Sequence, residues 1–253
     1  MNGREKRYHI GLDQQDIEGA EIALLPGDPG RVELIAKEME SPRMIGQCRE
    51  YTSWLGKIDE KTVLVMSTGM GGPSTAIAVE ELNMLGIKTM IRVGTCGGIK
   101  PEVKAGDVIV VSGAVRQEGT SLQYVPIEYP AIADVDLVCS LRDAAAELGY
   151  PCHIGIAQSK DSFYGQHDPA RMPVGYELQD KWEAWKKAGV LASEMETATL
   201  FTVASVYGMK ASAILLCVWN QEREALGLGN DEVHDMTIPI KIAIKAIKDH
   251  RTV

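Results

Sequence analysis

Arg92 lies in the stretch "TMIRVGTCGGI", where an apolar run leads into a glycine-rich turn. A guanidinium among apolar side chains is costly unless an anion meets it. Thr95, three residues later, adds a hydroxyl and a backbone N–H near the same turn. Arg92 therefore predicts either one arm of an oxyanion site or an internal ion pair with one of the many acidic residues.

The stretch "PGDPGR" has a similar character, with Gly27 at the end of an apolar run and Arg31 in the first turn of the next helical stretch. Unpaired backbone N–H groups at a helix start, together with a guanidinium, suit an anion the size of phosphate. The alternative is a tight Asp-Pro-Gly turn followed by a solvated arginine.

Two acidic residues, Glu194 and Glu196, flank Met195 in "SEMET", where a strand pattern gives way to a helical one. A carboxylate can accept a hydrogen bond from each of two vicinal ribose hydroxyls. However, Ser193 and Glu196 also have the S-x-x-E spacing of a helix capping box, so this motif alone favours a cap over a sugar site without excluding either.

An aromatic pair and a glutamine follow one another in "SKDSFYGQH". Phe163 or Tyr164 could stack on a flat heterocycle, and the Gln166 amide offers one donor and one acceptor to the edge of a nucleobase. The alternative is that the aromatic residues only close a core next to a polar loop.

Alternating strand and helix patterns must position these residues. Such alternation predicts an α/β fold of one domain, residues 1–253, with a mixed, mostly parallel twisted sheet covered by helices on both faces. Ligands of such sheets gather at the carboxyl ends of the strands. The expected strand-to-helix passages are 20–39, 61–87 and 190–208, the expected strands 89–95, 106–119, 153–163 and 210–220, and the expected helices 134–149 and 235–250.

Composition and missing motifs exclude several functions. A net charge of −9 without a basic patch argues against nucleic acid or anionic membrane as a partner. The chain shows no apolar run long enough for a bilayer, no signal-peptide pattern and no CxxC pair, so we expect a cytoplasmic protein. "GMGGPS" has Ser74 where a dinucleotide loop needs glycine, and no HExxH or G-x-S-x-G motif occurs.

Five motifs in this order, "PGDPGR", "STGMGGPSTAIAVEEL", "IRVGTCGGI", "SFYGQ" and "SEMETAT", resemble the nucleoside phosphorylase family, most closely its uridine phosphorylase branch. The resemblance runs from about His9 to the last helical pattern. It implies a pentosyltransferase that lets phosphate attack the anomeric carbon of a nucleoside, giving free base and ribose 1-phosphate. The implied enzyme requires no cofactor, since inorganic phosphate is its co-substrate. The resemblance also implies a homodimer built into a homohexamer.

The resemblance also implies roles for single residues. Phosphate would be bound by Gly27, Arg31, Arg92 and Thr95, with Arg49 contributed across a dimer interface, the ribose by Met195, Glu196 and a neighbouring subunit's His9, and the base by Phe163 and Gln166. Glu50, Met70 and Ser74 match a monovalent-cation position between subunits, which predicts K⁺ there; the alternative is that they complete local hydrogen bonds.

The sequence departs from the uridine phosphorylase pattern at two base-binding positions. Asp168 and Gln221 stand where that pattern has arginines. We hypothesise that Lys160, which the usual pattern lacks, supplies the missing positive charge to the leaving base. Asp161 offers the purine-side rival, so a purine nucleoside phosphorylase remains an alternative, as do a water-using nucleosidase and a nucleoside-binding protein on the same fold.

Overall fold

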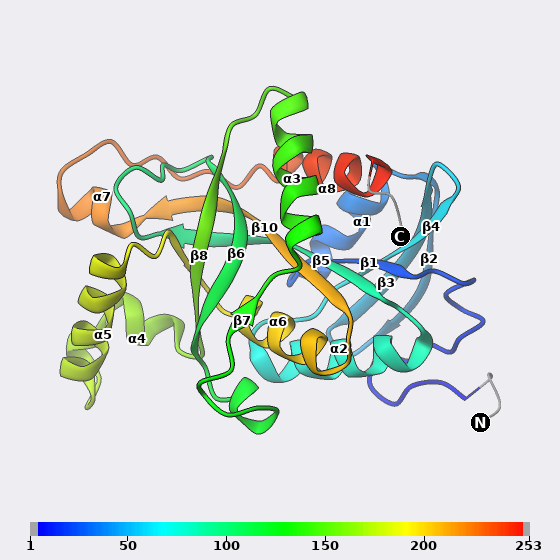
Figure 1. The fold of residues 1–253 in the computed structure, drawn as a ribbon, viewed down its shortest axis with the longest axis horizontal. Helices are drawn as coiled ribbons and strands as arrows, with labels where there is room; N and C mark the ends of the chain where they lie inside the picture. The colour runs from blue at the N-terminus through cyan, green and yellow to red at the C-terminus, as the bar shows by residue number, and fades with distance from the viewer. Residues whose placement is uncertain (1–4, 250–253) are drawn as a thin grey trace.

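The computed structural model describes residues 5–249, so both ends of the predicted 1–253 domain lie outside it. One mixed sheet runs through this part of the chain (Figure 1). Its strands are β1 (Ile22–Leu25), β2 (Glu40–Cys48), β3 (Tyr51–Ile58), β4 (Lys61–Met66), β5 (Thr89–Gly98), β6 (Val108–Gln117), β7 (Ala131–Ile132), β8 (Cys152–Lys160), β9 (Ala192–Glu194) and β10 (Lys210–Asn220).

Helices cover both faces of the sheet, as predicted. In Figure 1, α1, α3 and α8 lie on one side, α2 and α6 on the other, and α4, α5 and α7 gather at one end. The helices are α1 (Val32–Ala36), α2 (Gly72–Leu85), α3 (Val135–Glu147), α4 (Phe163–His167), α5 (Gly175–Ala188), α6 (Thr197–Val206), α7 (Gln221–Ala225) and α8 (Thr237–Asp249), with short 3-10 turns at η1 (Pro29–Arg31), η2 (Ser121–Gln123) and η3 (Pro169–Arg171).

Five strands close into a ring. The sheet order is β10-β6-β8-β9-β5-β1-β4-β3-β2, and β10 also pairs with β5, so β5, β9, β8, β6 and β10 form a small barrel from which β1, β4, β3 and β2 extend. Parallel pairs join β1 to β4 and β5, β5 to β10, and β8 to β6 and β9. The other pairs, including both pairs of the outer β2–β3–β4 hairpins, are antiparallel.

Local signals account for the main helices. Asp134 caps α3 by accepting a hydrogen bond from the backbone N–H of Leu137, and the buried Leu137, Leu141 and Ala144 recur at helical spacing on the face toward the sheet. α2 ends at Gly86, whose φ of 101° is the left-handed conformation that glycine tolerates best. These helices bury the two faces of the sheet in two apolar clusters.

The β2–β3 hairpin and helices α4 and α5 were not among the predicted elements. The hairpin turns at Arg49, and the chain turns again at Asp59, between β3 and β4; these residues have φ values of 53° and 52°. Because neither turn residue is glycine, the sequence lacks the usual mark of a left-handed turn there. β2 is also largely exposed and therefore has no buried apolar run.

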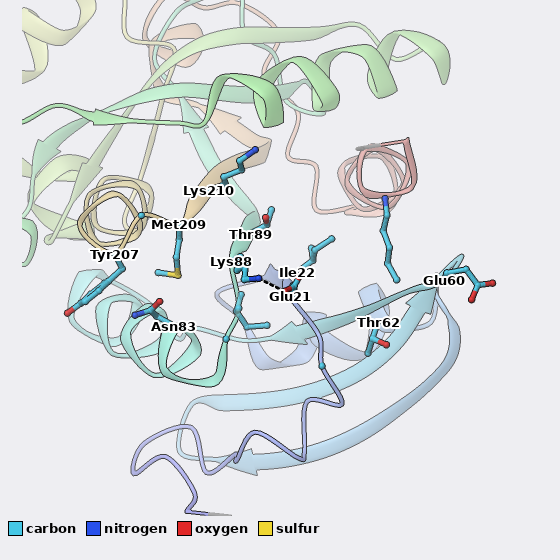
Figure 2. Close-up of a pocket in the computed structure, with 15 residues that line it drawn as sticks. Glu21, Ile22, Glu60, Thr62, Asn83, Lys88, Thr89, Tyr207, Met209 and Lys210 are labelled. Atoms are coloured by element: carbon cyan, nitrogen blue, oxygen red, sulfur yellow. Dashed lines mark hydrogen bonds and ion pairs between the residues drawn. The ribbon is translucent and has the colours of Figure 1, made fainter. Parts of the chain in front are cut away.

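A cavity of about 800 Å³ lies at the amino ends of the strands, away from every residue singled out for chemistry (Figure 2). Ile22, Thr89 and Lys210, which begin or nearly begin β1, β5 and β10, line it, and Lys88 pairs with Glu21 at its wall. The candidate chemistry therefore gathers at the opposite, carboxyl end of the sheet. Within residues 5–249 no helix is both long and apolar enough to cross a membrane.

Candidate active site

The predicted phosphate residues meet at the carboxyl ends of β1 and β5. Leu25, the last residue of β1, pairs with Arg92 of β5, which places Gly27 beside the Arg92 side chain. Arg31, which closes η1, brings Nη1 to 3.5 Å from Thr95 Oγ1. The structure thus brings all four residues into one small region.

The turn that carries Arg31 is well built. Asp28 accepts a hydrogen bond of 2.8 Å from the backbone N–H of Gly30, which is the Asp-Pro-Gly turn considered from the sequence. Burial lowers the pKa of Arg31, Asp28 opposes that shift, and the positive charge of Arg92 adds to it. Turn and cation are therefore both present, and two like charges lie side by side in a way that favours a bound anion.

Arg92 is both an ion-pair partner and an open donor. Its Nε donates to Glu194 Oε2 at 3.1 Å, and its Nη2 lies 2.5 Å from Glu196 Oε2. In the described part of the chain its Nη1 is buried with no hydrogen-bond partner. A Cβ on Gly27 would stand 3.7 Å from that atom, so the unpaired donor faces the glycine turn. Such a buried donor needs an acceptor, and an oxyanion supplies one.

Gly94 allows this arrangement. A Cβ at this position would lie 2.7 Å from both Cζ and Nη2 of Arg92, because the guanidinium folds back across its own strand. Any larger residue at 94 would push the guanidinium out of the site. The requirement is steric, since the glycine does not adopt a left-handed conformation.

Glu194 and Glu196 have different tasks. Glu194 accepts hydrogen bonds from the backbone N–H groups of Glu196 and Thr197 and from the Ser159 hydroxyl. Burial alone would raise the pKa of Glu194, but Arg92 and these hydrogen bonds lower it below its ordinary value. Glu194 is therefore a fixed counter-ion that also closes the start of α6.

Glu196 is held more loosely. Its Oε1 accepts from the backbone N–H of Gly71 at 2.6 Å and its Oε2 meets Arg92. Burial raises the pKa of Glu196, and the neighbouring Glu194 adds to this rise against the opposing effect of Arg92. The capping box is not formed, because the Glu196 side chain makes no cap hydrogen bond and Glu194 does so instead. Glu196 keeps lone pairs for a sugar, with Met195 half-buried beside it.

Two of the three predicted base residues, Lys160 and Gln166, line a second cavity of about 510 Å³ at the ends of β8 and α4, together with Gln221. Phe163 is not among the residues that line it. The ammonium of Lys160 donates to Ser193 Oγ at 2.6 Å and lies 5.8 Å from the centre of the Phe163 ring. A cavity of this size is typical of small-molecule sites.

The charge of Lys160 is poised near neutral pH. Burial lowers its pKa to about 8, while Glu194 and Glu196 oppose that shift. Phe163 is half-exposed and presents its ring next to His167, with centroids 4.3 Å apart. The Lys160 ammonium therefore lies close to the Phe163 ring and lines the same cavity as the Gln166 and Gln221 amides.

Comparison with known proteins places this arrangement in a family. The phosphorylase superfamily model matches residues 21–238, which include the whole phosphate and carboxylate cluster. The chain belongs to the phosphorylase superfamily. It is 48% identical over 241 residues to a uridine phosphorylase of Treponema pallidum, which covers 95% of this chain and 93% of that protein.

Two further relatives differ in the nucleoside that their names give. A uridine phosphorylase of Salmonella typhimurium is 40% identical over 244 residues, covering 95% of this chain and 96% of the relative. A guanosine phosphorylase of Halorubrum lacusprofundi is 39% identical over 209 residues, covering 83% and 81%. Fold class and family, as predicted from the sequence, are confirmed.

His9 and Arg49, which were predicted to serve a neighbouring subunit's site, contact other residues of their own chain. His9 Nδ1 lies 2.6 Å from Glu81 Oε1, and the Arg49 guanidinium lies 5.5 Å from the centre of the Tyr8 ring. Within residues 5–249 neither makes a hydrogen bond or ion pair with Arg31, Arg92 or Glu196. Their contribution to a neighbouring subunit's site stays a prediction.

The residues predicted for a monovalent cation do lie together, around Gly69. A Cβ on Gly69 would be 2.9 Å from Glu50 Cγ and 3.2 Å from Ser74 Oγ, and Ser74 Oγ donates to the Met70 carbonyl at 3.2 Å. Local hydrogen bonds thus use part of this group, and K⁺ binding stays a prediction. Residues 5–249 hold no cluster of three or more His, Cys, Asp or Glu residues that could bind a metal ion.

Asp161, the predicted purine contact, and Asp168, at a position where the uridine phosphorylase pattern has arginine, both have partners nearby. Asp161 accepts a hydrogen bond of 2.9 Å from the backbone N–H of Gly119. Asp168 is exposed and lies 3.4 Å from Arg171 Nε. Asp168 is not among the residues that line the base cavity, whereas Gln221 lines that cavity with a buried Oε1 that has no partner in the described chain.

Sequence reasoning did not find every residue that shapes the site. The Ser159 hydroxyl donates a hydrogen bond to Glu194 and accepts one from the backbone N–H of Ala198 in the first turn of α6. Ser193 and Gln158 hold the Lys160 side of the base cavity. No spacing marks Ser159 or Gln158, and the S-x-x-E spacing of Ser193 indicated a helix cap instead. The steric need for Gly94 does leave a trace, as a glycine inside a buried strand two residues after an arginine.

Proposed function

We propose that this chain is a uridine phosphorylase, which catalyses the reversible phosphorolysis of uridine to uracil and ribose 1-phosphate. The observation that carries the proposal is the unpaired, buried Nη1 of Arg92 beside Arg31 and Thr95, with Glu196 on the same guanidinium. An anion site and a sugar-binding carboxylate in direct contact are what phosphate attack on a ribose requires. The named relatives support the same substrate.

Phosphate is bound by the backbone at Gly27 and by Arg31, Arg92 and Thr95. The guanidinium groups match two oxygens at once and hold the dianion next to the anomeric carbon. Arg49 of the partner subunit completes this set. Positioning the two reactants is worth on the order of 7 kcal/mol in favourable systems, so no covalent enzyme intermediate is required.

The ribose lies on Glu196 and Met195, with His9 of the partner subunit near the 5′-hydroxyl. Breaking the glycosidic bond develops positive charge on the sugar and negative charge on the base. The phosphate dianion and Glu196 stabilise the first. Because Glu196 shares Arg92 with the phosphate, sugar and nucleophile are held by one guanidinium.

The base lies between Phe163 and Gln166, with the Lys160 ammonium close by. Developing negative charge on uracil is stabilised by a preorganised donor in a place of low polarity. The buried Lys160 fills this role in place of the arginines that Asp168 and Gln221 replace.

A purine nucleoside is the second candidate substrate, because a guanosine phosphorylase is among the relatives. Asp161, the residue that would meet a purine, already accepts a backbone hydrogen bond from Gly119. This contact favours uridine.

One assay separates the candidate functions. Uridine, thymidine and inosine are each supplied with and without phosphate, and free base is measured. Phosphate-dependent release of uracil, faster than release of hypoxanthine, supports the proposal. Faster hypoxanthine release indicates a purine enzyme, phosphate-independent release a nucleosidase, and binding without turnover a nucleoside-binding protein.

The chain is further proposed to act in the cytoplasm in pyrimidine salvage, as homodimers built into a hexamer with K⁺ at a subunit interface. His9 contacts Glu81 and Arg49 contacts Tyr8, rather than the residues of their own chain's phosphate and ribose sites, which supports assembly. Sedimentation of the purified protein, with K⁺ or Na⁺ as the salt, tests the oligomer and its cation dependence; a fully active monomer would contradict it.

A further inference from the structure

Five polar side chains form a continuous path from helix α5 to the base cavity. The Trp185 indole N–H donates to Gln117 Oε1 at 2.8 Å, and Gln158 Nε2 donates to the same oxygen at 2.7 Å. Gln158 Oε1 lies 2.5 Å from Ser193 Oγ, which lies 2.6 Å from Gln166 Oε1. The path joins β6, β8 and β9, whose ends lie side by side.

The path has only one consistent direction, and Trp185 sets it. An indole N–H can only donate, so Gln117 must present its oxygen. Gln158 must then present its NH₂ group to that oxygen, which turns the Gln158 oxygen toward Ser193. Ser193 must therefore give its single hydrogen to Gln158.

Ser193 has no hydrogen left for a second acceptor. Its lone pairs accept from Lys160 Nζ at 2.6 Å and can accept from one more donor. An amide oxygen of Gln166 at 2.6 Å would face the hydroxyl oxygen with no hydrogen between them. The Gln166 amide satisfies this contact when Nε2 donates to Ser193 and Oε1 faces the cavity, an orientation that hydrogen bonds alone decide.

We propose that Trp185 is a positioning residue that fixes the Gln166 amide, through Gln117, Gln158 and Ser193, with its oxygen toward the base. This inference rests on the proposed function. An amide oxygen in the cavity accepts a hydrogen bond from the N3–H of uracil. Cytosine carries a bare acceptor at N3 and is rejected there.

Trp185→Phe tests the inference, because it removes the indole donor and keeps an aromatic ring. Without that donor the Gln117 and Gln158 amides can turn over, and Gln166 then populates both orientations. Apparent affinity falls by the fraction of the competent orientation. We expect kcat/KM for uridine to fall about fivefold, mainly through KM, with the KM for phosphate unchanged.

Trp219→Phe is the matched control. Trp219 lies on β10, donates its indole N–H to Glu224 at 2.9 Å outside the path, and is not among the residues that line the base cavity. The substitution removes the same indole donor from a side chain that is also half-buried. We expect the uridine KM of this variant to stay within twofold of the parent protein.

Gln117→Glu supplies the rescue. A carboxylate can only accept, so it fixes the direction of the path without any indole. Trp185→Phe should therefore cost little when it is introduced into Gln117→Glu, although no packing has been restored. If the parent protein does not release uracil from uridine and phosphate, the proposed function fails. If it does, an equal loss in both tryptophan variants, or no rescue, overturns the positioning role alone.

Discussion

The two ends of the candidate site are built on different physical grounds. The phosphate end relies on full charges: Arg92 is held by Glu194 and Glu196 and keeps one donor open. The base end relies on neutral amides and a hydroxyl around Lys160, whose pKa burial lowers to about 8. Charge makes the first end strong and tolerant of small shifts, whereas the second depends on which way each hydrogen points.

This difference predicts a gradient of mutational effects. Removing a charge at the phosphate end leaves other buried charges without a counter-ion, so both activity and stability change. Removing a donor at the base end mainly changes how well a particular base is bound. The following experiments run from the largest expected effect to the smallest.

Arg92→Ala should have the largest effect. It removes a donor aimed at the phosphate and leaves Glu194 and Glu196 buried without their counter-ion. We expect turnover to fall about 10³-fold and the free energy of unfolding to fall by about 3 to 5 kcal/mol. Steady-state kinetics with varied phosphate and urea unfolding measure the two effects.

Arg92→Lys keeps the folded state measurable, because it retains a positive charge without the fork that meets two carboxylates and an oxyanion. Its phosphate KM should still rise. A lysine variant with unchanged phosphate KM would show that Arg92 serves the carboxylates alone.

Glu196→Gln should reduce turnover of uridine by about 10²-fold, because the ribose loses its charged acceptor. The glutamine can still accept from Gly71, and the neighbouring Glu194 no longer faces a like charge. Stability should hence change little by thermal unfolding. Glu194→Gln is the contrasting variant, expected to unfold more easily since it disturbs hydrogen bonds from four donors. Equal behaviour of the two variants would contradict their separate tasks.

Lys160→Met should lower turnover on uridine about tenfold or more, through loss of one electrostatic donor to the base. The ammonium is present below pH 8 and is lost as the pH rises through that value, so kcat of the parent protein should fall above about pH 8. That alkaline fall should be absent in the variant. A pH–rate profile measures both, and unchanged kinetics would refute the role of Lys160.

Arg31→Gln should have the smallest effect. Its side chain is about a quarter exposed, so solvent screens part of its charge. We expect the phosphate KM to rise severalfold with little change in the KM for uridine. A rise in both KM values would mean that Arg31 shapes the whole site.

Much of the fold was predictable because its central elements carry strong local patterns. The strand around Arg92 and the helices that start at Gly72 and Thr197 show long buried stretches. The β2–β3 hairpin was not, since Arg49 and Asp59 take turn conformations without a glycine. The closed ring of strands also escaped prediction, because pairing between β5 and β10 joins residues about 120 positions apart.

The phosphate end was predictable and the base end only in part. An arginine inside an apolar strand stands out, whereas its two carboxylate partners came as one motif with two possible roles. No charge or spacing in the sequence marks Gln117, Gln158 or Trp185, because their path exists only once three strands and α5 are assembled. Sequence reveals unusual charges more readily than cooperative hydrogen bonds.

The closed ring of β5, β9, β8, β6 and β10 fixes the distance between the two ends of the candidate site. Arg92 and Thr95, proposed for phosphate, lie on β5, and Lys160, proposed for the base, ends β8, so the spacing between these proposed sites is set by strand pairs that cannot slide independently. Moving β5 away from β8 would break strand pairing on both sides of the closed ring. Adjustment to a bulkier base must therefore come from α4, α5 and α7, which gather at the end of the molecule (Figure 1).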